Sequence, residues 1–363
     1  MNIYITYLES SVTEGGMSRN KGFYDYFLSQ QTTKIVNINR KNKLMRVLYC
    51  IWLILLLPFN KNKKIFIHQN AIVYMFTAAL LSCNLGEILL RKFIGNLSSR
   101  NLVIVEINDL MIEQAIDLGF SEVAYAKGFY ESIFSCQQLR FIFASHYMRD
   151  YAVSKYGIIC ANTEVVINGG SSLTKHNNYP ELEEAIRPFE DDVRLKFIYA
   201  GSVAQNRQIS ESIEIFIKNP NCILLIMGPG GAWLRQLELP ENIRYIGSFE
   251  NDLAVEIASH CDIGIVPYDE SKFYYNLCYP TKASFYICAG IPFLSTPLIE
   301  LRNVYEKLGI CVFYSIHEWA EYIGSLSSLD IVKMKNEIIT KDYVTKFSWN
   351  YLISAAMTIY LDK

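Results

Sequence analysis

The chain has 363 residues, of which 51% are hydrophobic and 19% charged, and its formal net charge is −2. This length exceeds what a single hydrophobic core usually supports, so we expect two domains. A net charge near zero argues against a general nucleic-acid-binding protein, and no nucleic-acid partner is predicted.

The nine cysteines occur singly, with no Cys-x-x-Cys pair and no paired spacing with histidine. Together with the lack of a cleavable leader ahead of the first predicted strand, this odd number indicates a reducing, cytoplasmic setting. We interpret the cysteines as small buried hydrophobic residues, and we predict neither a metal site nor a cofactor.

The first part of the chain alternates between predicted strands and helices. Strands are expected at residues 2–8, 34–38, 64–68, 102–107, 122–125, 140–144 and 164–167, and helices at 21–29, 71–81, 110–118 and 147–156. Continuous apolar strands alternating with helices are typical of a parallel, doubly wound sheet. Residues 1–168 are therefore predicted to form a Rossmann-like domain.

The most apolar segment of this domain is VLYCIWLILLLPF, at residues 47–59, which is bordered by basic residues on both sides. A membrane-spanning helix needs about 20 apolar residues, so this segment is too short to cross a bilayer. One interpretation is peripheral contact of residues 40–64 with an anionic membrane. The other is a core helix followed by a solvated lysine-rich loop.

A polar segment at residues 169–192 is predicted to be a linker. A second alternating series follows, with strands expected at 195–201, 222–228, 242–247 and 261–268 and helices at 209–217 and 252–260. We therefore expect a second Rossmann-like domain at residues 193–345 that faces the first across a cleft. The apolar segment 346–363, which carries Trp349, is predicted to be a terminal helix that crosses back to the first domain.

The segment NLCYPTKASFYICAGIP, at residues 276–292, combines a rigid turn, a single lysine, an apolar helix and a Gly-x-Pro stop. Because it follows a predicted strand, Lys282 should lie at the carboxyl edge of a parallel sheet, where such sheets bind ligands. A cation at a helix N-terminus opposes the helix dipole unless an anion joins it. Lys282 is therefore predicted to bind phosphate, joined by Arg207 from the loop that follows Gly201; the alternative for Arg207 is a surface role.

Seven motifs in order then carry a resemblance: ASHYMRDYAVSKYG, VVINGG, IYAGSVAQNRQ, LLIMGPGG, IRYIGSF, DIGIVPY and PTKASFYICAGIP. This order, over roughly residues 140–300, resembles the C-terminal half of bacterial GT-B glycosyltransferases. Within that fold, one set of residues is similar to sugar transferases of polysaccharide and O-antigen assembly, including galactofuranosyltransferases and related glucosyltransferases: Asn276, Pro280, Lys282, Ser284, Tyr286, Ala289, Gly290 and Pro292. The resemblance implies a nucleotide-sugar-binding C-terminal domain and an acceptor-binding N-terminal domain.

The residues expected to bind the donor lie at several strand ends. The resemblance adds Asn276 and Ser284 to Lys282, Arg207 and Gly201, and it implies that Ser248 reads a uracil edge beside a wall formed by Phe249 or Tyr268. The glycine-rich segment that includes Gly16 and Ser18 is interpreted either as a flexible lip over the donor phosphate or as a surface loop. The cluster GPGG, at residues 228–231, is interpreted as a structural turn.

The catalytic base is expected at a strand end of the first domain. Asp109 and His68 both follow predicted strands, and an inverting transferase needs such a group to accept the acceptor's hydroxyl proton. Asp109 is equally interpreted as the N-cap of the next helix. Many retaining GT-B enzymes carry two glutamates where this chain has Leu277 and Phe285, so the stereochemistry stays open.

The resulting hypothesis is a metal-independent glycosyltransferase of surface polysaccharide biosynthesis, such as that of lipopolysaccharide, O-antigen or capsule. It would move a hexose, with galactofuranose, galactose and glucose as the candidates, from a nucleotide diphosphosugar, expected to be UDP-linked, to a lipid-linked or oligosaccharide acceptor. We expect it in the cytoplasm, peripheral to the inner face of the cell membrane. Two alternatives remain: a UDP-sugar 2-epimerase and a catalytically silent partner subunit.

Overall fold

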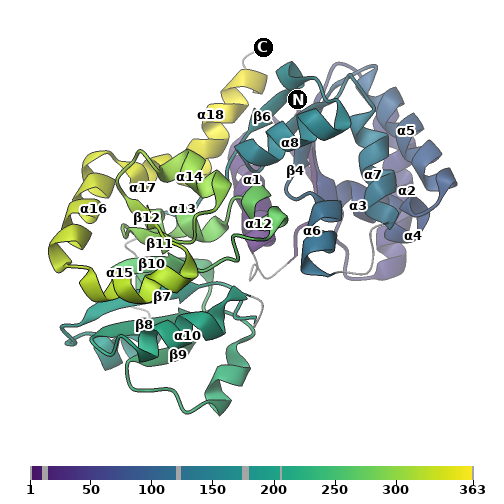
Figure 1. The fold of residues 1–363 in the computed structure, drawn as a ribbon. Helices are drawn as coiled ribbons and strands as arrows, with labels where there is room; N and C mark the ends of the chain where they lie inside the picture. The colour runs from purple at the N-terminus through teal and green to yellow at the C-terminus, as the bar shows by residue number, and fades with distance from the viewer. Residues whose placement is uncertain (1, 10–14, 120–123, 174–179, 205–206, 362–363) are drawn as a thin grey trace. The chain divides into compact units, whose positions relative to one another are not determined.

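The computed structural model describes residues 2–9, 15–119, 124–173, 180–204 and 207–361 (Figure 1). The chain forms two compact units. Unit 1 contains the first strand, residues Gly16–Ile167 and the chain from Ile353 onward. Unit 2 is built mainly from Asn168–Leu352.

Unit 1 is built on a six-stranded parallel sheet with the order β2-β1-β3-β4-β5-β6. Its strands are β1 (Asn2–Thr6), β2 (Thr33–Asn37), β3 (Lys64–His68), β4 (Leu102–Ile107), β5 (Arg140–Phe143) and β6 (Thr163–Val165). The central strands are buried on both faces, which explains their continuous apolar sequences. After β2 the chain returns past β1 and forms β3 on its other side. The topological switch point of this sheet therefore lies between β1 and β3.

The helices of unit 1 connect these strands and cover the sheet. They are α1 (Gly15–Ser29), α2 (Lys43–Leu56), η1 (Leu57–Phe59), α3 (Gln69–Phe76), α4 (Ala78–Leu81), α5 (Asn84–Ser98), α6 (Met111–Leu118), α7 (Ala124–Phe134), α8 (His146–Tyr156) and η2 (Cys160–Asn162). Aromatic side chains fill the space between helices and sheet: the rings of Tyr130 and Phe134 stack at 5.1 Å, and Phe134 meets Phe141 at 5.2 Å.

Unit 2 contains a second six-stranded parallel sheet with the order β12-β11-β10-β7-β8-β9. Its strands are β7 (Leu195–Ala200), β8 (Cys222–Met227), β9 (Ile243–Gly247), β10 (Ile263–Val266), β11 (Phe293–Ser295) and β12 (Cys311–Phe313). From β7 the chain builds outward through β8 to β9 and then returns to place β10 on the other side of β7. The topological switch point of this sheet therefore lies between β7 and β10.

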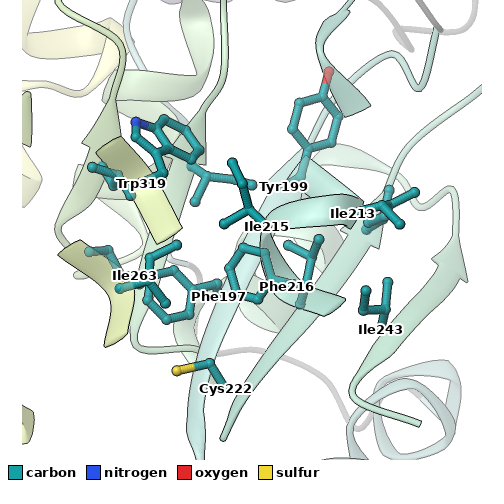
Figure 2. Close-up of a cluster of buried hydrophobic side chains, with 14 of the residues drawn as sticks. Phe197, Tyr199, Ile213, Ile215, Phe216, Cys222, Ile243, Ile263 and Trp319 are labelled. Atoms are coloured by element: carbon teal, nitrogen blue, oxygen red, sulfur yellow. The ribbon is translucent and has the colours of Figure 1, made fainter. Parts of the chain in front are cut away.

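The helices of unit 2 are α9 (Pro180–Ile186), η3 (Arg187–Phe189), α10 (Ile209–Ile217), η5 (Gly231–Gln236), α11 (Asn251–Ser259), α12 (Phe273–Leu277), α13 (Thr281–Cys288), α14 (Ile299–Tyr305), η6 (Ile316–Glu318), α15 (Trp319–Ser325), α16 (Ser328–Thr340), α17 (Tyr343–Lys346) and the start of α18 (Trp349–Leu361). Between the sheet and one helical layer, Phe197, Phe216, Ile263 and Trp319 form a core that excludes water (Figure 2). Fully burying each such side chain stabilises the fold by about 1.5–3 kcal/mol. The phenol of Tyr199 extends away from the rest of this cluster (Figure 2).

Helix α18 joins the two units in sequence, since its first residues belong to unit 2 and Ile353 onward to unit 1. In unit 2, the Trp349 backbone packs so closely on Gly169 that a Cβ there would lie 2.7 Å from the Trp349 nitrogen. In unit 1, the Tyr360 ring meets Phe66 edge-on at 6.3 Å and lies under the Arg140 guanidinium.

Several local expectations are wrong. A strand is expected at residues 122–125, but Ala124 and Tyr125 are the first residues of α7. Residues 122–123 lie outside the described residues. The helix expected at 71–81 is interrupted at Thr77, whose φ is 57°, and α5 was not predicted. The polar segment 169–192 contains the short helices α9 and η3, and its role as a linker stays a prediction.

Candidate functional site

One tyrosine fixes helix α13 against the strands of unit 2. The Tyr286 hydroxyl accepts a hydrogen bond from the Ala200 N–H (2.9 Å) at the end of β7 and donates to the Ile265 carbonyl (3.1 Å) of β10. Its ring lies over Gly264, where an added Cβ would be 2.3 Å away. The N-terminal turn of α13 is thus held at the carboxyl ends of the two strands that flank the switch point.

Lys282 projects from this first turn into an aromatic environment. Its Nζ lies 4.7 Å from the ring centre of Tyr199 and 5.4 Å from that of Tyr268. Gly201, with φ of 136°, passes so close that an added Cβ would be 2.4 Å from Nζ. Only glycine combines this backbone conformation with the room that the ammonium group needs.

Arg207 also lies against Tyr268. Its Cζ is 4.9 Å from the Tyr268 ring centre and 5.3 Å from that of Tyr275, and these two rings are 4.8 Å apart. We call Lys282 and Arg207 the cationic pair, and Tyr199, Tyr268 and Tyr275 the tyrosine wall. Cations over aromatic faces gain about 0.5–2 kcal/mol, so the wall holds both cations without a carboxylate.

The electrostatics of the cationic pair favour an incoming anion. Among the described residues, no aspartate or glutamate forms an ion pair with Lys282 or Arg207. Burial, reinforced by the Arg207 charge, lowers the pKa of Lys282. Tyr268 raises the pKa of Arg207, against the effect of burial. Burial alone would raise the pKa of Tyr268, but Lys282 and Arg207 together outweigh it and lower that pKa.

Two of the predicted donor-binding residues are engaged by the fold itself. The Asn276 amide donates to the carbonyls of Glu270 (2.8 Å) and Lys272 (3.0 Å) and accepts from the Ile299 N–H (3.0 Å). Ser284 is fully buried, and its hydroxyl bonds that of Tyr279 at 2.7 Å. The polar groups of Asn276 and Ser284 are thus hydrogen-bonded within the fold, and donor binding by these two residues stays a prediction.

The other predicted donor residues belong to other elements than the cationic pair. Ser248 is exposed and Phe249 half-buried in the segment after β9, two strands away from β7. Gly16 and Ser18 lie in the first turns of α1, in unit 1, so the glycine-rich segment is helical from Gly15 onward rather than a flexible lip.

A buried polar cluster, not predicted from the sequence, lies near the switch point of unit 1. Arg19 is fully buried; its Nε donates to Glu106 Oε1 (2.6 Å) and its Nη1 to the Val166 carbonyl (2.6 Å). Glu106 is the register partner of His68 on the neighbouring strand. Burial lowers the pKa of His68, whose Nδ1 accepts from the Asn70 N–H (3.2 Å) at the start of α3. His68 is thus a buried N-cap of α3, and its role as the catalytic base stays a prediction.

Asp109 is half-buried after β4, and the capping interpretation for it is wrong. Helix α6 begins at Met111, and the Met111 N–H donates to the Tyr130 hydroxyl (2.7 Å), which in turn donates to the Asp109 carbonyl (2.6 Å). The Asp109 carboxylate accepts from the Asn108 side chain (2.8 Å). Tyr130 therefore satisfies this helix start, and the carboxylate is not needed there.

Solved structures that match this chain over nearly its full length include glycosyltransferases. WaaG, a glycosyltransferase involved in lipopolysaccharide biosynthesis, is 10% identical and matches with a TM-score of 0.64 over 99% of this chain and 100% of its own. The chain has the GT-B fold. HepE from Anabaena, in complex with UDP-glucose, matches with a TM-score of 0.63 at 11% identity, over 99% of this chain and 100% of its own.

Sucrose-phosphate synthase from Thermosynechococcus elongatus shares the GT-B fold as well, with a TM-score of 0.67 at 10% identity over 100% of this chain and 98% of its own. No protein-family model matches the sequence, and no curated protein matches it significantly. Since all these identities are far below 25%, the similarity establishes the fold alone, and function must be argued from the site.

Proposed function

We propose that this chain is a glycosyltransferase that moves a hexose from a nucleotide diphosphosugar, UDP-linked, to a lipid-linked glycan of the cell surface. The observation that carries the proposal is the cationic pair: Lys282 and Arg207 both lie against the tyrosine wall in unit 2 and form no ion pair with a carboxylate among the described residues. Two positive charges at a switch point, with no ion-pair partner in the described part of the chain, suit a ligand with two negative phosphates.

The fold supports this ligand class. The HepE structures contain UDP-glucose, UDP, or UDP with glucose, and this chain matches them over nearly its full length. The WaaG match has a role in lipopolysaccharide biosynthesis, which supports a surface glycan as the product. Galactofuranose, galactose and glucose remain the candidate sugars, and we assign donor binding to unit 2 and acceptor binding to unit 1.

In the proposed inverting reaction, an acceptor hydroxyl oxygen forms the new bond to the anomeric carbon while the bond from that carbon to the diphosphate breaks. Asp109 accepts the hydroxyl proton, and the diphosphate leaves with the bonding electrons. Lys282 and Arg207 stabilise the charge that develops on the departing phosphate. The positive cationic pair, rather than a metal ion, provides this stabilisation in the proposal.

A thermal-shift panel of UDP-, GDP-, CMP- and dTDP-sugars tests the proposal and names the nucleotide. We expect UDP-sugars to raise the melting temperature and to be turned over when a lipid-linked acceptor is supplied. The same panel on Lys282→Met serves as the control for binding at the cationic pair. A chain that no nucleotide sugar stabilises would not be the proposed transferase.

A further inference from the structure

Helix α2 exposes an unusually large apolar surface. Cys50 and Leu53 are its buried residues, while eight large hydrophobic side chains on it are exposed: Leu44, Met45, Val47, Leu48, Ile51, Trp52, Leu55 and Leu56. Phe59 in η1 continues the surface and is 73% exposed. The core-helix interpretation of residues 47–59 is therefore wrong, because only a narrow stripe of α2 packs on unit 1.

A well-formed helix that is apolar on its outward face needs a nonaqueous partner. The helix itself is regular: the Asn42 side chain caps it by accepting from the Leu44 N–H (2.8 Å). Helix α5, which contacts η1, adds three more exposed apolar side chains, Leu85, Ile88 and Leu89. The helices α2 and α5 are labelled in Figure 1.

The chain segment that contains α2 and η1 carries charges of one sign only. Residues 26–86 contain no aspartate or glutamate, although acidic and basic residues are nearly balanced over the whole chain. The same stretch carries eight basic residues: Lys34, Arg40, Lys41, Lys43, Arg46, Lys61, Lys63 and Lys64. Seven of them lie just before α2, in its first turn, or just after η1.

Aromatic residues mark the boundary between the apolar and basic parts. The rings of Tyr49 and Trp52 stack at 5.6 Å, and the Arg40 guanidinium lies 4.2 Å from the Tyr49 ring centre. Tryptophan and tyrosine favour the headgroup level of a bilayer, where an apolar ring and a polar edge are both accommodated.

We propose that α2 and η1 form a membrane-docking surface that lies in the headgroup region of an anionic bilayer. Apolar side chains of α2 enter the acyl boundary, and the basic residues at both ends contact lipid phosphates. None of the helices that the structure describes is long and apolar enough to cross a membrane. A second copy of the chain fits less well, because a symmetric contact would bring the same basic residues face to face. The inference rests on unit 1 alone and is independent of the transferase proposal.

Vesicle sedimentation of the full chain tests this surface, using phosphatidylcholine alone and phosphatidylcholine with about a third phosphatidylglycerol. Ile51→Glu/Leu55→Glu removes apolar contact at two exposed positions, and Lys41→Gln/Lys43→Gln/Lys61→Gln removes three exposed charges. Matched controls in unit 2 are Leu329→Glu/Ile339→Glu, at 73% and 67% exposure, and Lys218→Gln/Lys307→Gln/Lys333→Gln.

We expect binding to the anionic vesicles and little binding to neutral ones. The apolar variant should bind at least about tenfold more weakly, and the charge variant about fivefold more weakly per lysine removed, while both controls bind normally. Addition of about 0.5 M salt should mimic the charge variant. All variants should keep the wild-type circular dichroism and nucleotide-sugar thermal shift, so that failure of docking is distinguished from failure of the proposed function.

Two results would overturn the inference. One is vesicle binding that the Ile51→Glu/Leu55→Glu change leaves intact. The other is a dimer in analytical ultracentrifugation that this change dissociates, since the apolar surface would then serve self-association.

Discussion

The sharpest prediction concerns Lys282→Met, which removes the charge and keeps most of the side-chain volume. Methionine fits beside Tyr199 and Tyr268 because a thioether packs well on aromatic rings. The substitution leaves Arg207 as the remaining cation of the pair. Since Lys282 forms no ion pair with a described carboxylate, its removal leaves no buried negative charge behind.

The expected changes in donor affinity and in stability follow from what the Lys282 amine contributes with and without bound donor. A hydrogen bond between charged groups contributes about 1.5–3 kcal/mol, so UDP-sugar affinity should fall by roughly 10- to 150-fold. Without donor, burial and the Arg207 charge both disfavour the ammonium form of Lys282. The free energy of unfolding of the unliganded variant should therefore equal or exceed that of the wild type.

Isothermal titration calorimetry with the preferred UDP-sugar measures the first effect, and urea unfolding measures the second. Lys218→Met, at an exposed position of unit 2, is the control and should change neither quantity. Unchanged donor affinity in Lys282→Met would refute the phosphate assignment. A loss of more than about 2 kcal/mol in unliganded stability would show instead that the lysine is structural.

The pH dependence of stability has a definite sign. Lys282 and Tyr268 both have pKa values lowered in the folded protein, from ordinary values of 10.5 and 10.0. Over the range below those ordinary values, the unfolded chain binds more protons at both groups, so their contribution to stability rises with pH. The unfolding free energy of wild type minus that of Lys282→Met/Tyr268→Phe should therefore increase from about pH 7 to about pH 10, and a flat difference would contradict the electrostatic description.

Three further predictions test other contacts. Gly201→Ala should weaken donor binding and lower the free energy of unfolding by about 1–3 kcal/mol, because the added Cβ meets Lys282 Nζ and the backbone φ is 136°. The control is Gly290→Ala, where φ is 78° and the space around the added Cβ is open. It should cost only backbone strain and leave the donor affinity measured by calorimetry normal. Asp109→Asn should lower kcat by about 10²- to 10⁴-fold with little change in donor Kd. The control Asp150→Asn, at an exposed position, should not lower kcat. A near-normal kcat in Asp109→Asn would remove Asp109 from the proposed mechanism. Arg19→Met should destabilise unit 1 by about 3–5 kcal/mol in urea unfolding, because it leaves Glu106 buried and without its ion-pair partner. The double variant Arg19→Met/Glu106→Gln should recover much of this loss. A destabilisation by Arg19→Met of less than about 1 kcal/mol would contradict a stabilising ion pair.

The parallel strands could be predicted closely from the sequence because they are buried on both faces. Residues 64–68 and 102–107 form β3 and β4 with the expected bounds, and residues 209–217 form α10. In these segments the local pattern and the tertiary environment agree, so propensity is not overruled.

Helices α5 and α7 escaped prediction because of glycines that serve helix packing. A Cβ at Gly86 would lie 1.8 Å from the Leu80 carbonyl oxygen, and one at Gly128 would lie 2.2 Å from that of Leu81. Glycine inside a helix normally lowers its stability by about 1 kcal/mol, so sequence patterns count it against a helix. Close approach of neighbouring backbones overrides this cost, and such contacts are invisible in one sequence.

The residues of the candidate site likewise divide into those that the sequence pattern can select and those that it cannot. Lys282 and Arg207 could be selected as candidates because strand ends, loops and helix starts are local features. Tyr199 and Tyr275 could not, since buried aromatic residues in a core and in a binding wall give the same pattern. The buried role of Arg19 could not be predicted either, because its partner Glu106 is 87 residues away in the chain.

The internal contacts of α12 and α13 also limit how this chain can select a sugar. Asn276 and Ser284 are hydrogen-bonded within unit 2, and Leu277, at one of the two expected glutamate positions, is fully buried. In the proposed complex this segment contributes the Lys282 charge to the diphosphate but no carboxylate to the sugar hydroxyls. Discrimination between hexoses that differ in one hydroxyl requires a polar group that is left unpaired by the wrong sugar. Residues 276–285 contain no carboxylate that could be this group, so we expect substitutions in other loops to be the effective way to change sugar specificity.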